Sequence, residues 1–157
     1  MKYHIITIGK IKEKYLTAGI EEFLKRLRPY GQVEITALPE EKMPENPSAA
    51  QKRQVLDKEG EKMLRHVRAG SHLFVLDVQG KLISSEEMAA KFADLALYGC
   101  SEMYIGGPFG LSDAVCKRAD SRISFGRITL THQMIRMILL EQIYRAIKIQ
   151  RHEPYHW

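Results

Sequence analysis

Short apolar runs alternate along the chain with longer segments in which apolar residues recur every three or four positions. The runs are rich in β-branched residues and predict strands, whereas the longer spacing predicts helices with one buried face. The predicted strands cover residues 3–8, 33–38, 72–78, 101–105 and 121–125. The predicted helices cover residues 13–28, 48–68, 84–98, 112–119 and 132–151. Because the two kinds alternate, the sequence predicts a single α/β domain, residues 1–157, with a mostly parallel sheet flanked by helices.

Local signals mark several boundaries of these elements. Pro29 ends the first helix, and three prolines within residues 39–47 predict a surface loop. Ser48 is a suitable N-cap for the second helix, and Ser84 with Glu87 three residues later opens the third in the manner of a capping box.

The last predicted helix is apolar around well over half of its circumference. Its apolar residues are Met134, Ile135, Met137, Ile138, Leu139, Leu140, Ile143, Ala146 and Ile147. A helix that is apolar on most sides is buried on most sides. A second subunit is the simplest cover for the side that the sheet leaves open, and a central core helix in a monomer is the alternative.

Length and composition are ordinary for a globular protein. The chain has 157 residues, of which 45% are hydrophobic and 27% charged, enough for one core without disulfides. Cys100 and Cys116 match no metal-ligand spacing and predict free thiols in a reducing compartment. The best apolar run, residues 134–140, is too short to span a membrane and contains Arg136, and no signal peptide is evident. We therefore expect a cytoplasmic protein with no metal and no membrane partner.

The net charge is concentrated at one end of the chain. Residues 117–157 contain eight Lys and Arg against three Asp and Glu, a balance of +5, while residues 1–116 contain sixteen of each. A basic region beside a small-molecule pocket is typical of an enzyme that acts on nucleic acid.

Two glycine-containing segments follow predicted strands and carry the candidate chemistry. Residues 105–112 read Ile-Gly-Gly-Pro-Phe-Gly-Leu-Ser, and residues 124–131 read Ser-Phe-Gly-Arg-Ile-Thr-Leu-Thr. Glycine lets the backbone turn with positive φ and lets a ligand approach closely. Ligands of open α/β sheets bind beyond the carboxyl ends of the strands. No complete Rossmann fingerprint or P-loop is present, and a tight turn without a ligand is the alternative for each segment.

Histidines and an aromatic tail complete the candidates. His132 begins the last helix, and the chain ends in Pro-Tyr-His-Trp with Tyr155 and His156. Such aromatic side chains stack on unpaired bases, whereas a structural hydrogen bond for His132 and a frayed terminus are the alternatives. No histidine or cysteine spacing suits zinc, and no Gly-x-Ser-x-Gly motif occurs. Arg145 follows Glu141 by four residues and either pairs with it or faces a site.

Taken together, these segments resemble the RlmH family of SPOUT-class methyltransferases, which methylate 23S ribosomal RNA. The similarity extends over essentially the whole chain. The matching segments are residues 7–15, 38–39, 57–60, 76–81, 105–112, 124–130, 132, 141–146 and 154–156. Two positions depart from the family pattern: Thr131 stands where proline is usual, and Trp157 where a basic residue is usual.

The resemblance implies methyl transfer from S-adenosylmethionine to N3 of a pseudouridine in the 23S rRNA of the assembled ribosome. It also implies a homodimer and a C-terminal trefoil knot. The cofactor-binding residues that it implies are Leu76, Gly106, Phe125, Gly126, Arg127, Ile128, Thr129 and Leu130.

Four residues are the candidates for catalysis: His132, Arg145, Tyr155 and His156. N3 of the base loses a proton during methylation. A histidine or tyrosine can accept that proton or hydrogen-bond to the developing charge, and Arg145 can neutralise charge on the base or a phosphate. Two alternatives are a non-catalytic ribosome- or RNA-binding module with the same fold, and a SPOUT methyltransferase acting on transfer RNA.

Overall fold

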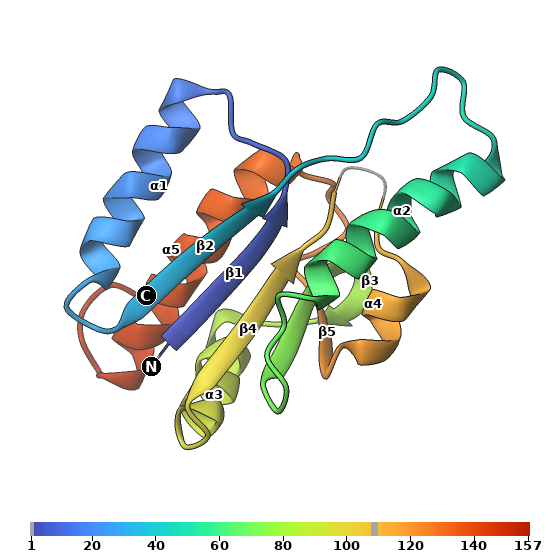
Figure 1. Ribbon diagram of the computed structural model, residues 1–157. Coiled ribbons are helices and arrows are strands. Elements are labelled where there is room, and N and C mark those ends of the chain that lie inside the picture. The colour runs from blue at the N-terminus through green and yellow to red at the C-terminus, as the bar shows by residue number, and fades with distance from the viewer. Residues whose placement is uncertain (1, 108–109) are drawn as a thin grey trace.

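Five parallel strands form one central sheet in the computed structural model, which describes residues 2–107 and 110–157 (Figure 1). The strands are β1 (Lys2–Ile8), β2 (Gln32–Leu38), β3 (His72–Leu82), β4 (Cys100–Ile105) and β5 (Ser121–Ser124). Their order across the sheet is β2-β1-β4-β3-β5, and each neighbouring pair of these strands is parallel. The prediction of an α/β domain with a parallel sheet is confirmed.

Helices cover both faces of the sheet (Figure 1). They are α1 (Lys14–Leu27), α2 (Ala49–Leu64), α3 (Ser85–Ala96), α4 (Asp113–Arg118) and α5 (His132–Gln150). Helices α1, α3 and α5 share one core with Tyr3 and Ile5 of β1, and α2 and α4 share the other with Ile6 and Ile8. Both faces of β1 are therefore buried, which is why its sequence shows no alternation of apolar and polar residues.

The element boundaries follow the sequence prediction closely, with two differences. Helix α2 ends at Leu64, four residues earlier than expected. Strand β3 continues to Leu82, because after a register shift Lys81 and Leu82 pair with the end of β5. This extension is largely exposed, so it lacks the apolar signal that predicts a buried strand. Both predicted N-caps, Ser48 and Ser84, are present, and each is part of a capping box, of which only the one at Ser84 was predicted.

Helix α5 is covered within the single chain. None of its residues, 132–150, is exposed, because the sheet and the flanking helices α1 and α3 pack around it. Leu139, Leu140 and Ile143 are completely buried. The single chain thus covers most of this helix, as expected for a central core helix, while Met134 and Ile138 remain partly exposed. The homodimer stays a prediction.

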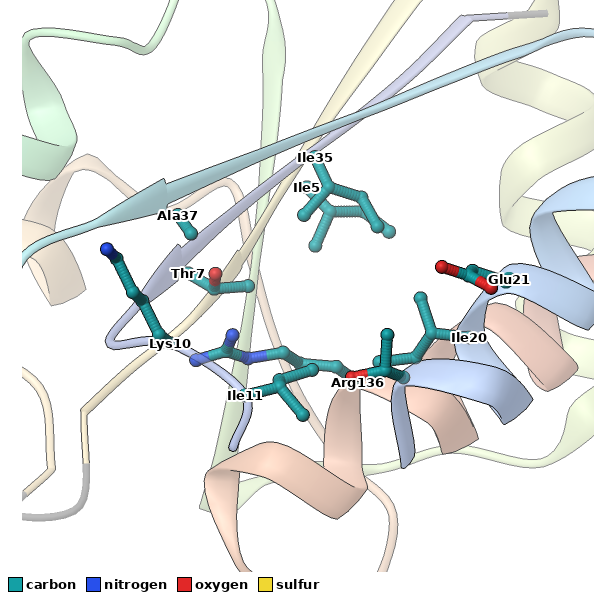
Figure 2. A pocket seen from close by; sticks show the side chains of 10 residues that line it. Ile5, Thr7, Lys10, Ile11, Ile20, Glu21, Ile35, Ala37 and Arg136 are labelled. Carbon is teal, nitrogen blue, oxygen red and sulfur yellow. The ribbon is translucent and has the colours of Figure 1, made fainter. Parts of the chain in front are cut away.

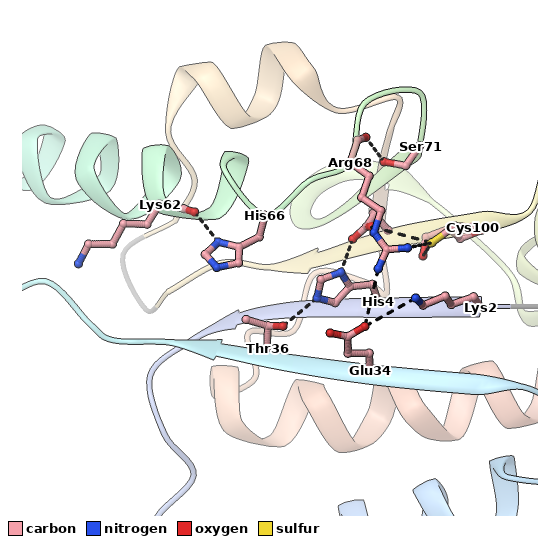
Figure 3. A network of polar contacts seen from close by, with 11 residues as sticks. Lys2, His4, Glu34, Thr36, Lys62, His66, Arg68, Ser71 and Cys100 are labelled. Carbon is pink, nitrogen blue, oxygen red and sulfur yellow. Dashed lines mark hydrogen bonds and ion pairs between the residues drawn. The ribbon is translucent and has the colours of Figure 1, made fainter.

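A cluster of polar side chains links β1, β2 and β4 on the face of the sheet that α2 covers (Figure 3). His4 of β1 lies between its two neighbouring strands: its Nε2 is 2.8 Å from Thr36 Oγ1 on β2, and its Nδ1 is 2.9 Å from Glu102 Oε2 on β4. The second contact has the distance of an ion pair but not the angles of a hydrogen bond. Glu102 is fully buried, and burial raises its pKa. A buried carboxylate of this kind is tolerated because His4 and Arg68 lie beside it.

Candidate functional site

The implied cofactor segments meet at the carboxyl ends of three neighbouring strands. Leu76 of β3 is in register with Ile105, the last residue of β4, and Gly106 follows directly. Strand β5 lies on the other side of β3, and residues 125–130 continue from its end. The structure thus brings Leu76, Gly106 and this loop to one edge of the sheet, where open α/β folds bind ligands.

Glycine is needed in these loops for two different reasons, a positive φ at some positions and a lack of space for a Cβ at another. Gly110 and Gly126 have φ of +107° and +128°, and a Cβ on either would meet no atom within 4 Å. Gly106 has no positive φ, and a Cβ there would lie 2.6 Å from Leu111 Cδ2 and 3.0 Å from the Gly110 carbonyl oxygen. Replacing Gly106 would therefore distort the loop itself rather than only fill a ligand's space. Pro108 and Phe109 of the predicted glycine turn lie outside the described residues.

Helix α2 packs against the glycine-containing loop between β4 and α4. Glu59 is buried, and its pKa is raised chiefly by that burial. A Cβ on Gly107 would lie 3.1 Å from its Oε1. One residue further along α2, a Cβ on Gly60 would overlap Ser112, the N-cap of α4. The Asp-Lys-Glu-Gly segment at 57–60 thus packs against both ends of the loop between β4 and α4.

The loop of residues 125–130 is anchored at its start and exposed at its end. Ser124 Oγ accepts a hydrogen bond from the Gly126 amide at 3.1 Å and lies 3.1 Å from the Val78 carbonyl oxygen. Phe125 packs against the hydrophobic core that α1, α3 and α5 share. In contrast, Ile128 is 82% exposed and Leu130 37% exposed. Apolar side chains presented to solvent on a loop beside a sheet edge are available to a ligand or a second subunit.

His132 is the first residue of α5 and lies at the same edge of the sheet. Thr131 Oγ1 caps the helix by accepting from the Met134 amide at 3.1 Å, so the unusual threonine has a structural role. His132 Nε2 is buried without a hydrogen-bond partner among the described residues and lies 3.6 Å from Glu40 Oε1. Burial, and secondarily Arg136, lower the pKa of His132, whereas Glu40 raises it. The balance keeps this imidazole neutral near pH 7.

Glu40 is a site residue that the sequence prediction missed. It lies two residues after the end of β2, and Gly9, with φ of +86°, directly follows β1. A Cβ on Gly9 would overlap the Glu40 carboxylate. The strands β1 and β2 are adjacent and parallel, so their ends bring Gly9 and Glu40 together near His132. The only sequence signal near Glu40 was that the preceding residues, Leu38 and Pro39, are one of the segments that resemble the RlmH family.

The other three catalytic candidates form a cluster of their own. The tail folds back along α5 after His152, which has positive φ. Tyr155 donates a hydrogen bond to Glu141 Oε1 at 2.9 Å, and its ring lies 4.7 Å from the Arg145 guanidinium carbon. Arg145 Nη1 lies 3.2 Å from His156 Nδ1, and its Nη2 donates to Glu141 at 2.5 Å. The tail is therefore held by side-chain contacts and is not a frayed end.

None of the three residues of this tail cluster offers an unpartnered atom that could accept a proton. Burial, followed by the hydrogen bond to Glu141, raises the pKa of Tyr155, so the phenol keeps its proton at neutral pH. The ring of His156 has both nitrogens engaged, because Nε2 also lies 2.8 Å from Glu86 Oε1. With the arginine donating to Nδ1, the proton of a neutral His156 is on Nε2. These residues can donate hydrogen bonds and present positive charge, but among the four candidates only His132 has an unpartnered ring nitrogen.

His132 and the tail cluster lie apart within one chain. Tyr155 is held at Glu141, nine residues beyond His132 on α5, which is about 14 Å along the helix axis at 1.5 Å per residue. One small base cannot touch both. The structure therefore joins Arg145, Tyr155 and His156 but does not bring His132 to them.

Most basic side chains of the C-terminal region form ion pairs. Of the eight basic side chains in residues 117–157, five form ion pairs: Arg118, Arg122, Arg145, Lys148 and Arg151. Arg136 is buried, and its Nη2 donates to the Ile8 carbonyl oxygen at 2.6 Å. Three of the partner carboxylates, Asp120, Glu141 and Glu153, are already counted in the balance of +5, and only Asp77 comes from outside the region. The region therefore keeps an excess of positive charge, although most of its basic side chains are held by ion pairs.

Other expectations concern metals, thiols and membranes. Within residues 2–107 and 110–157, no three His, Cys, Asp or Glu side chains lie together as metal ligands would. Cys100 and Cys116 are free thiols, each half-buried. Among the helices described above, none combines the length and apolarity needed to cross a bilayer.

Comparison with known proteins identifies close relatives over the full length. A family model described as a predicted SPOUT methyltransferase matches residues 1–156. A protein of Listeria monocytogenes named ribosomal RNA large subunit methyltransferase H is 52% identical over 158 aligned residues, covering 99% of each chain. A protein of the same name from Symbiobacterium thermophilum is 51% identical over 160 aligned residues, again covering 99% of each chain.

A solved structure supports the fold alone. The structure of a probable methylase family protein from Haemophilus influenzae superposes with a TM-score of 0.51 over 96% of this chain and 66% of that one. The sequence identity is 13%, so the likeness concerns architecture and not substrate.

Proposed function

The chain belongs to the SPOUT methyltransferase family, and we propose that it transfers a methyl group from S-adenosylmethionine to N3 of a pseudouridine in the 23S rRNA of the assembled ribosome. The observation that carries this proposal is the full-length similarity to proteins named for methylation of large-subunit rRNA. A cytoplasmic location and a C-terminal knot, both typical of the family, belong to the same proposal.

The described residues suit the cofactor in shape and composition. Open space adjoins Gly110 and Gly126, and Ile128 and Leu130 present apolar side chains next to it. Pockets for such molecules are apolar with a few backbone contacts. We assign cofactor binding to Leu76, Gly106 and residues 125–130. S-adenosylmethionine supplies an electrophilic methyl group on a sulfonium.

Among the four candidates, His132 is best suited to take the proton from N3. A general base needs a free lone pair and a pKa near or below the working pH. The half-buried imidazole of His132 is neutral near pH 7 and its Nε2 lacks a hydrogen-bond partner within the described chain. Arg145, Tyr155 and His156 are donors, suited to the carbonyl oxygens of the base, where negative charge develops as the proton leaves.

A homodimer would bring these two groups of residues together. Exposed apolar side chains lie on the end of β3 and on the adjoining loop, at Val78, Leu82 and Ile128. Exposed apolar patches on a folded chain mark interaction surfaces. We propose that a second copy covers this surface and that the tail of one subunit reaches the site headed by His132 of the other. The separation of about 14 Å between the two groups within one chain supports this arrangement.

Two measurements test the activity itself. Ribosomes from a strain that lacks the protein should carry an unmodified pseudouridine at the target, and the purified protein should methylate it with S-adenosylmethionine. Calorimetry should detect S-adenosylmethionine binding to the free protein. A non-catalytic ribosome-binding module would neither methylate the ribosomes nor bind S-adenosylmethionine. If transfer RNA were the substrate, the ribosomal pseudouridine would still be methylated in the deletion strain.

The pH dependence tests the role of His132. Because the unprotonated imidazole is the active form, the turnover should fall as pH drops through the pKa of His132, which burial places below its ordinary value of about 6.5. Glu40 raises that pKa, so Glu40→Gln should move the acid limb to lower pH. The matched control is Glu41→Gln, since Glu41 pairs with Lys62 instead. Identical acid limbs in all three proteins would exclude His132 as the titrating group.

A further inference from the structure

A cavity of about 410 Å³ opens between α1 and the β1–β2 side of the sheet (Figure 2). Its walls are mainly the side chains of four isoleucines, Ile5, Ile11, Ile20 and Ile35. None of the implied cofactor-binding residues lines it. Its volume lies in the range of small-molecule sites, which is roughly 300–1,000 Å³. The function proposed above leaves this cavity without an occupant.

Polar groups stand at one end of the cavity. Thr7 and Arg136 lie side by side there, and Lys10 extends from the loop after β1 (Figure 2). Thr7 Oγ1 and Arg136 Nε are both buried without a hydrogen-bond partner in the described chain. Buried polar atoms normally have partners, and an unsatisfied one has a cost. These two atoms are therefore the candidates for hydrogen bonds to a molecule in the cavity.

Unpaired basic side chains lie next to the cavity in the sequence. Lys10 lines it, Lys12 follows in the loop after β1, and Lys14 begins α1, and all three are exposed. The ion pairs of residues 2–107 and 110–157 include none of them. Tyr15, the next residue, is 65% exposed. This short segment offers three positive charges against one negative charge, Glu13, together with an aromatic ring, whereas the C-terminal basic residues are mostly paired with carboxylates.

We propose that this cavity binds an unpaired nucleotide of the RNA substrate, with the base between the isoleucines and the neighbouring phosphates on Lys10, Lys12 and Lys14. Apolar walls suit the faces of a base, and proteins that read single-stranded RNA take splayed-out bases in this way. Thr7, Thr17 and Glu21 line the cavity and supply hydrogen-bond partners for the edge of the base. This inference rests on the proposed function, because that function supplies the RNA.

The nucleotide held here is a neighbour of the methylated one. Thr7 and Leu76 are both in register with Ile105 of β4, one from each side, so two strand spacings, about 10 Å, separate them. A methyl group cannot cross that distance. The cavity and the cofactor edge nevertheless lie at the same end of the sheet, with Glu40 and His132 beside the lysine loop. The cavity thus fixes the position of the RNA strand relative to the reacting base.

Filling the cavity tests the proposal. Thr17 lies on the exposed side of α1 and lines the mouth, so Thr17→Trp should block it without disturbing the core. We expect the KM for ribosomes to rise about 5- to 150-fold, the range for loss of one base contact, with unchanged S-adenosylmethionine affinity and thermal midpoint. Ala18→Trp, which adds the same ring at an exposed position of α1 that does not line the cavity, should behave like the wild type. Equal KM values for Thr17→Trp and wild type would overturn the proposal.

The lysines are tested by salt dependence. Lys10→Ala/Lys12→Ala should weaken ribosome binding and flatten the plot of log affinity against log salt by about 0.7–0.9 per lost phosphate contact. Lys52→Ala/Arg53→Ala removes the same charge from exposed positions on α2 and should leave the slope unchanged. Equal slopes for the two double variants would contradict the assignment.

Three further results separate the possible failures. If the wild type and Thr17→Trp methylated ribosomes equally well, the cavity proposal would be wrong and the proposed function would stand. Wild-type protein that neither binds S-adenosylmethionine nor methylates ribosomes would remove the function itself. If Thr17→Cys formed a disulfide between two copies in dilute solution, the cavity would be part of a subunit interface and the RNA proposal would be wrong.

Discussion

Replacing His132 by alanine is expected to lower the rate of methyl transfer to ribosomes by about 100- to 10,000-fold, the usual contribution of a general base. The physical reason is that the imidazole of His132 is the one candidate whose ring nitrogen is unpartnered and whose pKa is lowered by burial. The affinity for S-adenosylmethionine should change little, because His132 lies beyond the implied cofactor segment. Single-turnover kinetics with saturating cofactor and calorimetry measure the two quantities separately.

The control for this variant is His66→Ala. His66 is an exposed histidine after α2 whose Nδ1 lies 2.9 Å from the Lys62 carbonyl oxygen, far along the chain from the site. Its removal should leave the rate unchanged. If His132→Ala methylated within a few-fold of the wild-type rate, the proton of N3 would leave to water and His132 would be a structural residue.

The fold was predictable because its signals are local. Strand β1 and the first part of β3 are short apolar runs, and Ser48 and Ser84 are the N-caps that their sequences indicate. The extension of β3 to Leu82 was missed, since its pairing with β5 is a long-range contact made by exposed residues. The polar cluster around His4 was missed for the same reason, because its partners come from β2 and β4.

The site was predictable only in part. The glycine loops were found because glycine marks positive φ, which Gly110 and Gly126 confirm. Glu40 was not found, since a carboxylate on a charged loop looks like any solvated residue until the ends of β1 and β2 place it beside His132. The ion pair between Arg122 and Asp77 was not predicted, because it joins residues far apart in the sequence.

Mixing two inactive variants should restore activity if the site is shared between subunits. One variant is His132→Ala with an intact tail, and the other has an intact His132 but lacks residues 155–157. Each alone should be nearly inactive while binding S-adenosylmethionine normally, since neither change touches the implied cofactor loops. In a mixed dimer, His132 of one subunit meets the tail of the other, which rebuilds one complete site of two. Random exchange makes about half of all dimers mixed, so an equal mixture should regain about a quarter of wild-type activity.

The alternatives give distinct outcomes in the same experiment. If His132 and the tail of a single subunit acted together, every site in the mixture would still lack one of them, and activity would stay at the level of the variants. The separation of about 14 Å along α5 argues against that arrangement, because Tyr155 is fixed at Glu141 by a hydrogen bond of 2.9 Å. A tail-deleted protein that methylates ribosomes at the normal rate by itself would show that Tyr155 and His156 only stabilise the end of α5. Sedimentation of the mixture must show that subunits exchange, and a stable monomer at micromolar concentration would contradict the shared site directly.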